Sequence, residues 1–437
     1  MRGSFDPEIL ILGGGGLGPV TALKIAQLGC EVGLVRISDS SAPQGDTFRN
    51  HGWLQSGLIY SGPRGLDLFE SKLMYFWGRQ LHRELYIEPP TEQGIFRTGF
   101  DDRAAQVIEA SKRLKVPVDT VSDHEAARLL KELHKPAKHH FWVPDAPFDE
   151  ARVLTTAREM AMEFGADLVD LPPNERPPHL ELDDKEPNGY RVIVAGRILR
   201  PRITILCTGQ ALPSLLSQVN FFPPLAVFRS TLLRAENVDW IQAPLLFDLD
   251  TGFAIVNHLS EDRSKHWAVF CDSKRVKLTS YSRRVTKEEF DSAISFLPES
   301  LRGTDPYNSF KATAGHKTEI LDERGHPSAR HWIEEVPNCK GLFAAIPGKA
   351  TVVLWVALEI LKKAGIAKAT DNGDYERILL PPDRSNSSPS SSSANLPPWD
   401  ASVEMHWERS DLNDLCSGDS KDGEDEKGEA AAAGNKD

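Results

Sequence analysis

The feature that most constrains this chain is a run of four glycines between an apolar strand pattern and an apolar helix pattern. Residues 9–12 (Ile-Leu-Ile-Leu) predict a buried strand, and residues 13–16 are all glycine. The helix pattern that follows ends at Gly29, and residues 32–35 predict a second strand. A strand, a glycine turn, a helix and a second strand in this order are typical of the first unit of a doubly wound α/β fold.

The glycine spacing predicts a binding site for a dinucleotide. Gly13 allows a tight turn after the strand, Gly15 lets the backbone approach a pyrophosphate, and Gly18 lets the helix pack closely on the sheet. The helix N-terminus, next to Gly16, then offers free N–H groups and a partial positive charge to the phosphates. A glycine-rich turn that binds nothing stays open as the alternative, because the pattern can occur without a ligand.

One residue departs from the usual pattern of such sites. The second strand commonly ends in an acidic residue that binds the ribose hydroxyls, but here Arg36 stands in its place. An arginine there suits the 2′-phosphate of NADP, which makes an NADP-dependent reductase the rival interpretation. Asp39 is the nearest carboxylate that could take the missing role.

Charge and length narrow the class of protein. The 437 residues allow two or three packed units, and the net charge is −12. Residues 381–437 hold 13 acidic and 5 basic residues, so the rest of the chain is close to neutral and no nucleic-acid partner is expected. The serine-rich and acidic composition of residues 381–437 predicts a disordered tail.

Several kinds of segment are not found in the sequence. No apolar run comes near the roughly 20 residues that a membrane-spanning helix needs, and no secretory signal is visible. We therefore expect a cytoplasmic protein without a transmembrane segment. The five cysteines have no metal-ligand spacing, so no metal site is expected.

Four further segments make the chain resemble a known family of flavoproteins. They lie at residues 49–60 (RNHGWLQSGLIY), 148–166, 205–209 (ILCTG) and 341–351 (GLFAAIPGKAT). In their order and their amino-acid sequence, these segments resemble the D-amino-acid oxidase-like family of FAD-dependent oxidoreductases. They resemble most of all the branch with glycine oxidase and L-2-hydroxyglutarate oxidase. The chain departs from the family at residues 347–349, where Pro-Gly-Lys replaces the usual Gly-His or Gly-Gly turn.

The resemblance implies FAD as the cofactor and an α/β fold in three parts. A Rossmann-like FAD-binding domain would take residues 1–88, 141–217 and 333–365. A discontinuous, strand-rich substrate domain would take residues 89–140 and 218–332, and the disordered C-terminal tail residues 381–437. The candidate cofactor-binding residues are Gly13, Gly15, Gly16, Gly18, Arg36, Arg49, Asn50, Gly52, Ser56, Gly57, Thr208, Gly209, Gly348, Lys349, Ala350 and Thr351.

The implied reaction is oxidation of a small amine or 2-hydroxy acid by hydride transfer to flavin N5. A 2-hydroxy acid needs a base for its hydroxyl proton and a cation for its carboxylate, whereas an amine can react as its free base. His51 and His258 are the candidate bases, and Lys349 is the candidate cation beside the reduced flavin. Further candidate groups are His266, Arg229, Arg234, His316 and Lys317.

The expected partner is a small-molecule substrate with a carboxylate. The electron acceptor stays open between oxygen and a quinone. A redox-inactive nucleotide-binding protein that kept the fold is the second alternative to the flavoenzyme, since Arg36 and the Pro-Gly-Lys turn both depart from the usual patterns.

Overall fold

The structure is a computed structural model of the chain. The described residues are 5–37, 51–60, 68–135, 137–172, 174–236, 241–259, 266–271, 276–277, 285–302, 306–328 and 330–367. The expected acidic tail at residues 381–437 lies outside them, as do Asp39, Arg49 and Asn50.

The first sheet has six strands in the order β19-β20-β12-β1-β2-β8. The inner strands run parallel, and β19 pairs antiparallel with β20 at one edge. All four residues of β1 are buried, as expected for a parallel strand covered on both faces. The bounds are β1 Ile9–Leu12, β2 Val32–Ile37, β8 Asp167–Leu171, β12 Ile203–Leu206, β19 Trp332–Glu335 and β20 Leu342–Ile346.

Helices cover one face of this sheet, and a small sheet with a short helix covers the other. The helices α1 (Leu17–Gln27), α5 (Glu150–Glu163) and α10 (Val353–Lys363) pack together with α2 (Leu68–Glu84) in one hydrophobic core. The N-cap Asp149 accepts a hydrogen bond from Arg152 N at 2.9 Å and fixes the start of α5. The opposite face packs on α6 (Leu212–Ser217) and on β9 (His179–Leu182), β10 (Tyr190–Val194) and β11 (Arg197–Leu199).

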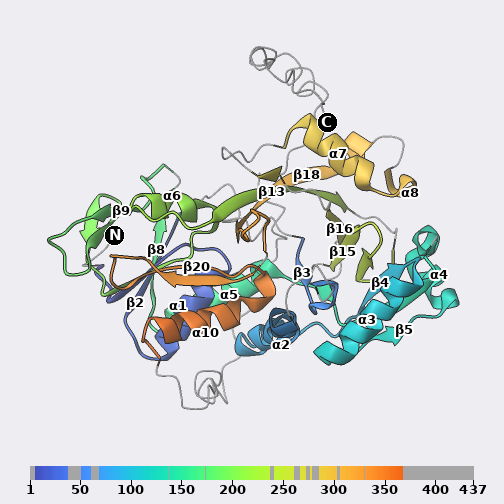
Figure 1. Cartoon of the computed structure of the whole chain (residues 1–437), viewed down its shortest axis with the longest axis horizontal. Helices are drawn as coiled ribbons and strands as arrows, with labels where there is room; N and C mark the ends of the chain where they lie inside the picture. Colours follow the sequence, from blue (N-terminus) through green and yellow to red (C-terminus); the bar gives the residue numbers. More distant parts are fainter. Residues whose placement is uncertain are drawn as a thin grey trace, which may run out of the picture.

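The second sheet has nine strands and lies beside the first (Figure 1). Its main path is β17-β13-β16-β15-β14-β4-β6-β5, and β18 pairs with β13. The strands are β4 Gly94–Thr98, β5 Asp119–Thr120, β6 His139–Val143, β13 Leu225–Glu236, β14 Leu245–Asp248, β15 Ala254–Leu259, β16 His266–Cys271, β17 Val276–Lys277 and β18 Lys311–Ile320.

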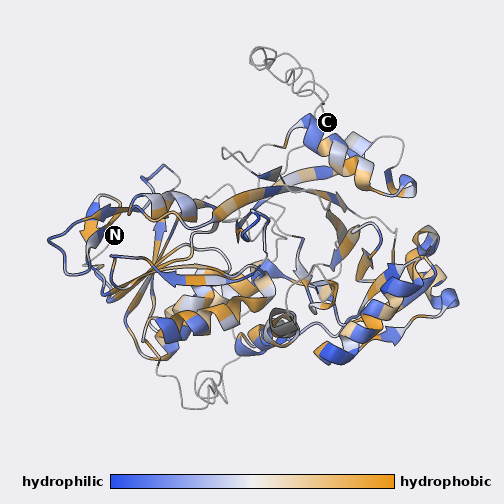
Figure 2. Cartoon of the chain, viewed as in Figure 1, coloured by the Kyte–Doolittle hydropathy of each residue, from blue (hydrophilic) through white to orange (hydrophobic). Residues whose placement is uncertain are grey.

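The two faces of the second sheet differ in what covers them. One face packs on α4 (Asp123–Leu130), on the 3-10 turn η3 (Lys131–His134) and on α7 (Lys287–Phe296), with α8 (Glu299–Arg302) and α9 (Pro306–Ser309) nearby. The other face packs on α3 (Asp101–Leu114), on the 3-10 turn η2 (Leu58–Tyr60) and on Trp53 of β3 (Trp53–Leu54). Figure 2 shows hydrophobic residues concentrated in the strands of the first sheet and on the helix sides that meet it.

The sheets refine the division of the chain that the sequence suggests. The expected start of the second FAD-binding segment, residue 141, falls inside β6, which pairs with β4 in the second sheet. The crossing back to the first unit therefore comes after Val143. There β7 (Ala146–Pro147) pairs with β3, so a two-stranded ribbon joins the two sheets.

Candidate functional site

The carboxyl ends of four neighbouring parallel strands bring the sequence motifs together. In the order β20-β12-β1-β2, the strands are directly followed or ended by Pro347-Gly348-Lys349, Cys207-Thr208-Gly209, Gly13 and Arg36. Ligands of open α/β sheets bind outside this edge. The edge is therefore the candidate cofactor site.

The glycine loop is built so that no side chain fits in it. Gly13 has φ of +120°, and an added Cβ would lie 2.3 Å from the Cys207 carbonyl oxygen. A Cβ on Gly18 would lie 1.9 Å from the Gly13 carbonyl oxygen. The Gly13 N–H donates to Val35 O at 2.9 Å and holds the turn. These positions require glycine for the turn and for the helix packing that the spacing predicts.

The start of α1 presents its N–H groups next to this loop. Its N-cap is Gly16, so no side chain caps the helix, and no acidic residue lies in the first turn. Residues 13–16 are partly exposed, although the strand before them and the helix after them are buried. This leaves a partly positive helix end beside an accessible backbone, as pyrophosphate binding needs.

Arg36 lies against the loop but is paired within the sheet. Its Nη2 donates to Asp170 Oδ2 at 2.6 Å, and its Nε contacts the other oxygen of the same carboxylate, which β8 contributes from the neighbouring strand. A Cβ on Gly14 would lie 2.6 Å from Arg36 Cβ. Asp170 thus brings a carboxylate to the end of β2, where Arg36 stands in place of the usual acidic residue. It also offsets the positive charge of Arg36, which binding of a 2′-phosphate would need.

The turn after β20 carries Lys349 and the N-terminal end of α10. Gly348 has φ of +68°, and Lys349 is the N-cap of the 3-10 turn η5 (Ala350–Val352), which runs into α10. Lys349 Nζ lies 2.5 Å from the Tyr60 hydroxyl and 4.3 Å from the centre of its ring. This contact joins the turn to the segment after β3.

Two buried hydroxyls at this edge fit the expected dinucleotide. Among the described residues, neither Thr208 Oγ1 nor Thr351 Oγ1 has a hydrogen-bond partner, although both atoms are buried. Buried polar groups usually have a partner, so an absent ligand is a natural explanation. Together with the glycine loop and the start of α1 at Gly16, these hydroxyls fit FAD.

The segment at residues 51–57, which we call the flavin loop, has a tightly fixed path. Gly52 and Gly57 both have positive φ, at +59° and +88°. A Cβ on Gly52 would lie 2.5 Å from His258 Cε1, and one on Gly57 would lie 2.3 Å from Ser71 O. Ser56 is fully buried. The expected cofactor contacts Arg49 and Asn50 lie just outside the described residues.

The structure brings the two candidate histidines together. His258 Nε2 lies 3.1 Å from the carbonyl oxygen of His51, and the His51 ring packs edge-on against Trp53 at 5.5 Å between centroids. The pairing of β15, β16, β13 and β18 then places Arg234 and Lys311 on the same sheet face as His258. That face also packs on Trp53.

The remaining candidate cations divide between the two sheet faces. Lys317 lies six residues after Lys311 in β18, so both side chains are on the same face of the sheet. Lys317 also forms an ion pair with the buried Glu319. Arg229 instead faces α7, where its Nη2 lies 2.8 Å from Glu289 Oε2, and His316 is its partner across the strands. Arg229 and His316 therefore point away from the flavin loop. The side chain of His266 lies outside the described part.

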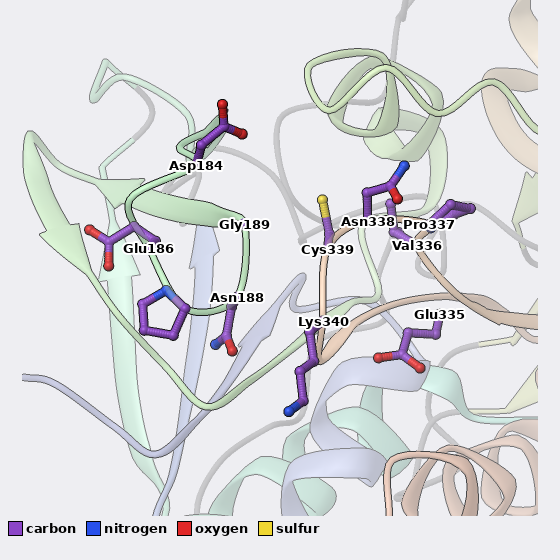
Figure 3. Close-up of a pocket in the computed structure, with 11 residues that line it drawn as sticks. Asp184, Glu186, Asn188, Gly189, Glu335, Val336, Pro337, Asn338, Cys339 and Lys340 are labelled. Carbon is purple, nitrogen blue, oxygen red and sulfur yellow. The ribbon is translucent and has the colours of Figure 1, made fainter.

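A surface hollow of about 510 Å³ lies at the opposite edge of the first sheet (Figure 3). It is formed by the turns between β9 and β10 and between β19 and β20, at the amino end of β20. Its charged side chains, Asp184, Glu186, Glu335 and Lys340, point in different directions. The hollow takes no part in the candidate site.

The architecture thus defines a class: a Rossmann-type nucleotide-binding unit whose cofactor edge faces a large, mostly antiparallel sheet. Residues 8–310 match the DAO family of FAD dependent oxidoreductases. The chain belongs to this family and is an FAD-dependent oxidoreductase, with FAD as its cofactor. The expectations of family, fold class and cofactor are confirmed.

Relatives show the same fold at low sequence identity. Glycine oxidase from Geobacillus kaustophilus has a TM-score of 0.62 at 15% identity, covering 85% of this chain and 97% of that one. L-proline dehydrogenase from P. horikoshii has 0.63 at 15%, covering 83% and 93%. The FAD-bound L-alpha-glycerophosphate oxidase of Mycoplasma pneumoniae has 0.64 at 14%, covering 84% and 98%.

One curated relative is similar in sequence over a shorter stretch. Anaerobic glycerol-3-phosphate dehydrogenase subunit A1 of Haloferax volcanii is 27% identical over 168 residues, which are 37% of this chain and 27% of the relative. The match thus spans about a quarter of that protein. Among the described residues, no helix has the length and apolar character to cross a membrane.

Proposed function

We propose that the protein oxidises a small amine or 2-hydroxy acid that carries a carboxylate, by hydride transfer to N5 of FAD. The observation that carries the proposal is the contact of His258 with the flavin loop, because it supplies a candidate base next to the segment that the proposal assigns to the flavin. FAD, when bound, supplies the two-electron acceptor. Oxygen or a quinone is the proposed next acceptor, and the cytoplasm the proposed location.

The tautomer of His258 follows from its hydrogen bond. A carbonyl oxygen only accepts, so Nε2 carries the proton that it donates to His51 O, and the neutral ring keeps its basic lone pair on Nδ1. As the base, His258 would take the hydroxyl proton of a 2-hydroxy acid at Nδ1. The His51 carbonyl would hold the ring in place while it does so.

Cations on the same sheet face would hold the substrate carboxylate. Arg234 Nη2 and Lys311 Nζ lie 3.0 and 3.1 Å from the same Glu236 oxygen, and Lys317 lies further along β18. A substrate carboxylate would bind these cations by charge-assisted hydrogen bonds, beside the carboxylate of Glu236. At the other side of the cofactor edge, Lys349 would stabilise the negative charge that a reduced flavin gathers.

The experiment mixes the FAD-loaded protein, without oxygen, with small amino acids and with 2-hydroxy acids, and follows bleaching of the flavin. If a 2-hydroxy acid is the substrate, His258→Gln should slow bleaching by roughly 10²- to 10⁴-fold. If an amine is the substrate, the loss should be much smaller. His124→Gln is the matched control, because this exposed histidine lies in α4, which packs on the sheet face opposite the flavin loop. Bleaching by neither class would contradict the proposal.

A further inference from the structure

A buried carboxyl group is hydrogen-bonded to the flavin loop. Asp145 is fully buried and comes two residues after β6, where the chain crosses from the second sheet to the first. Its Oδ2 accepts a hydrogen bond from Trp53 Nε1 at 2.8 Å, and its Oδ1 accepts one from Ser56 N at 3.2 Å. One carboxylate therefore holds both a side chain and the backbone of the flavin loop.

The surroundings leave the flavin loop little freedom around this anchor. The loop cannot move toward α2 without meeting Ser71 O, or toward β15 without meeting His258, since both already crowd its glycines. Leu58 N donates to Ser56 Oγ at 3.4 Å and continues the hydrogen bonding along the segment. A loop confined on two sides takes its remaining position from the anchor at Asp145.

In the described part of the chain, the positive charge of an arginine acts on Asp145. Arg79 of α2 is the charged group near it, and its Nη2 donates to the neighbouring Pro144 O at 2.5 Å while its guanidinium lies 4.6 Å from the centre of the Tyr75 ring. From β3 and its loop, Trp53 and Ser56 offer only neutral donors. Burial raises the pKa of Asp145 to about 6, against the effect of these hydrogen bonds.

We propose that Asp145 is a positioning residue for the flavin: its carboxylate fixes Trp53 and Ser56 so that the loop presents one surface to the isoalloxazine ring. The inference rests on the proposed function in taking this loop as the one beside the flavin. An ionised carboxylate has acceptors for both N–H groups, whereas a protonated one has turned one oxygen into a donor. The loop is therefore held more firmly above the pKa of Asp145 than below it.

The test measures the midpoint potential of bound FAD by dithionite titration, from pH 5 to pH 8, in the full-length FAD-loaded protein. Asp145→Asn is nearly isosteric and imitates the protonated acid. The potential of the variant should lie above that of the unchanged protein at pH 8, because a buried negative charge has been removed, and the two should converge below about pH 6. Equal potentials at every pH would overturn the proposal.

Asp248→Asn is the matched control. Asp248 is also buried, is paired with an arginine at 2.6 Å and accepts from the backbone of its own turn, but it lies in the second sheet on the face opposite the flavin loop. This variant should have a lower melting temperature, but the midpoint potential of its bound FAD should be unchanged. A shift of equal size in both variants would show general loosening and would count against Asp145.

A second variant decides the question if Asp145→Asn does not fold or does not hold FAD. Trp53→Phe keeps the acid but removes one donor to its carboxylate, so the pH at which the potential changes should move upward. If the potential of Trp53→Phe changes at the same pH as that of the unchanged protein, the proposal is overturned. Dithionite reduces FAD without a substrate, so these results do not depend on the substrate screen. If neither substrate class bleaches the flavin, the proposed reaction is contradicted, but the role of Asp145 is not.

Discussion

The two sheets offer binding groups of different kinds. At the carboxyl edge of the first sheet the groups are mostly backbone: a glycine loop with no room for a Cβ at Gly13 or Gly18, and a helix whose N-cap, Gly16, has no side chain. On the inner face of the second sheet the proposed groups are polar side chains, namely Arg234 of β13, Lys311 of β18 and His258 of β15. A backbone site accepts few substitutions, whereas a side-chain site can change its ligand by single replacements.

The largest expected effect is at the glycine loop. Gly15→Val adds a branched side chain where the backbone must approach the pyrophosphate. Loss of two charge-assisted hydrogen bonds costs about 3–6 kcal/mol, so FAD binding should weaken by roughly a hundredfold or more while the fold persists. Gly99→Val is the control, because a Cβ there has only an ordinary contact, 3.4 Å from Asp250 Oδ2. Bound FAD at one equivalent in Gly15→Val would rule out this loop as the cradle.

A smaller effect is expected at Lys349. Lys349→Met should leave FAD bound but lower its potential and slow its reduction by roughly a hundredfold, because a charge beside the reduced flavin is lost. Lys340→Met, in the hollow at the opposite edge, should change neither quantity. A Lys349→Met protein with the original potential would place the ammonium away from the flavin.

The smallest effect is expected at Arg36. Its ion pair with Asp170 is partly exposed, with 11% and 41% of the side chains accessible, so Arg36→Gln should cost about 1 kcal/mol of stability or less. FAD affinity should change by less than about tenfold. We choose Gln because Glu would place a second carboxylate beside Asp170. Calorimetry that finds NADP binding in the unchanged protein and none in Arg36→Gln would favour the rival account.

The difference between the sheets also explains what the sequence could predict. The strand, glycine loop and helix at residues 9–27 are local, and the carboxyl ends of parallel strands meet at one edge by construction. The motifs at residues 205–209 and 341–351 therefore join the glycine loop as soon as the sheet is parallel. This is why the fold class and the cofactor were predictable.

The side-chain pairs were not predictable because they depend on register between distant segments. Asp170 meets Arg36 across 134 residues, and Asp145 meets Trp53 across 92. Nothing in the sequence near Asp145 or Asp170 distinguishes it from a surface acid. Likewise, Arg229 and Arg234 look equivalent along the chain, and only the alternation of β13 separates the face of α7 from the face of the flavin loop.

The measurement that tests the central claim most directly is the absorption spectrum of the purified protein, together with the amount of FAD that it releases on denaturation. The account predicts a yellow protein with one FAD for each chain, bound without added NADP. A colourless protein that cannot be reconstituted with FAD, and that binds NADP more tightly than NAD, would contradict it.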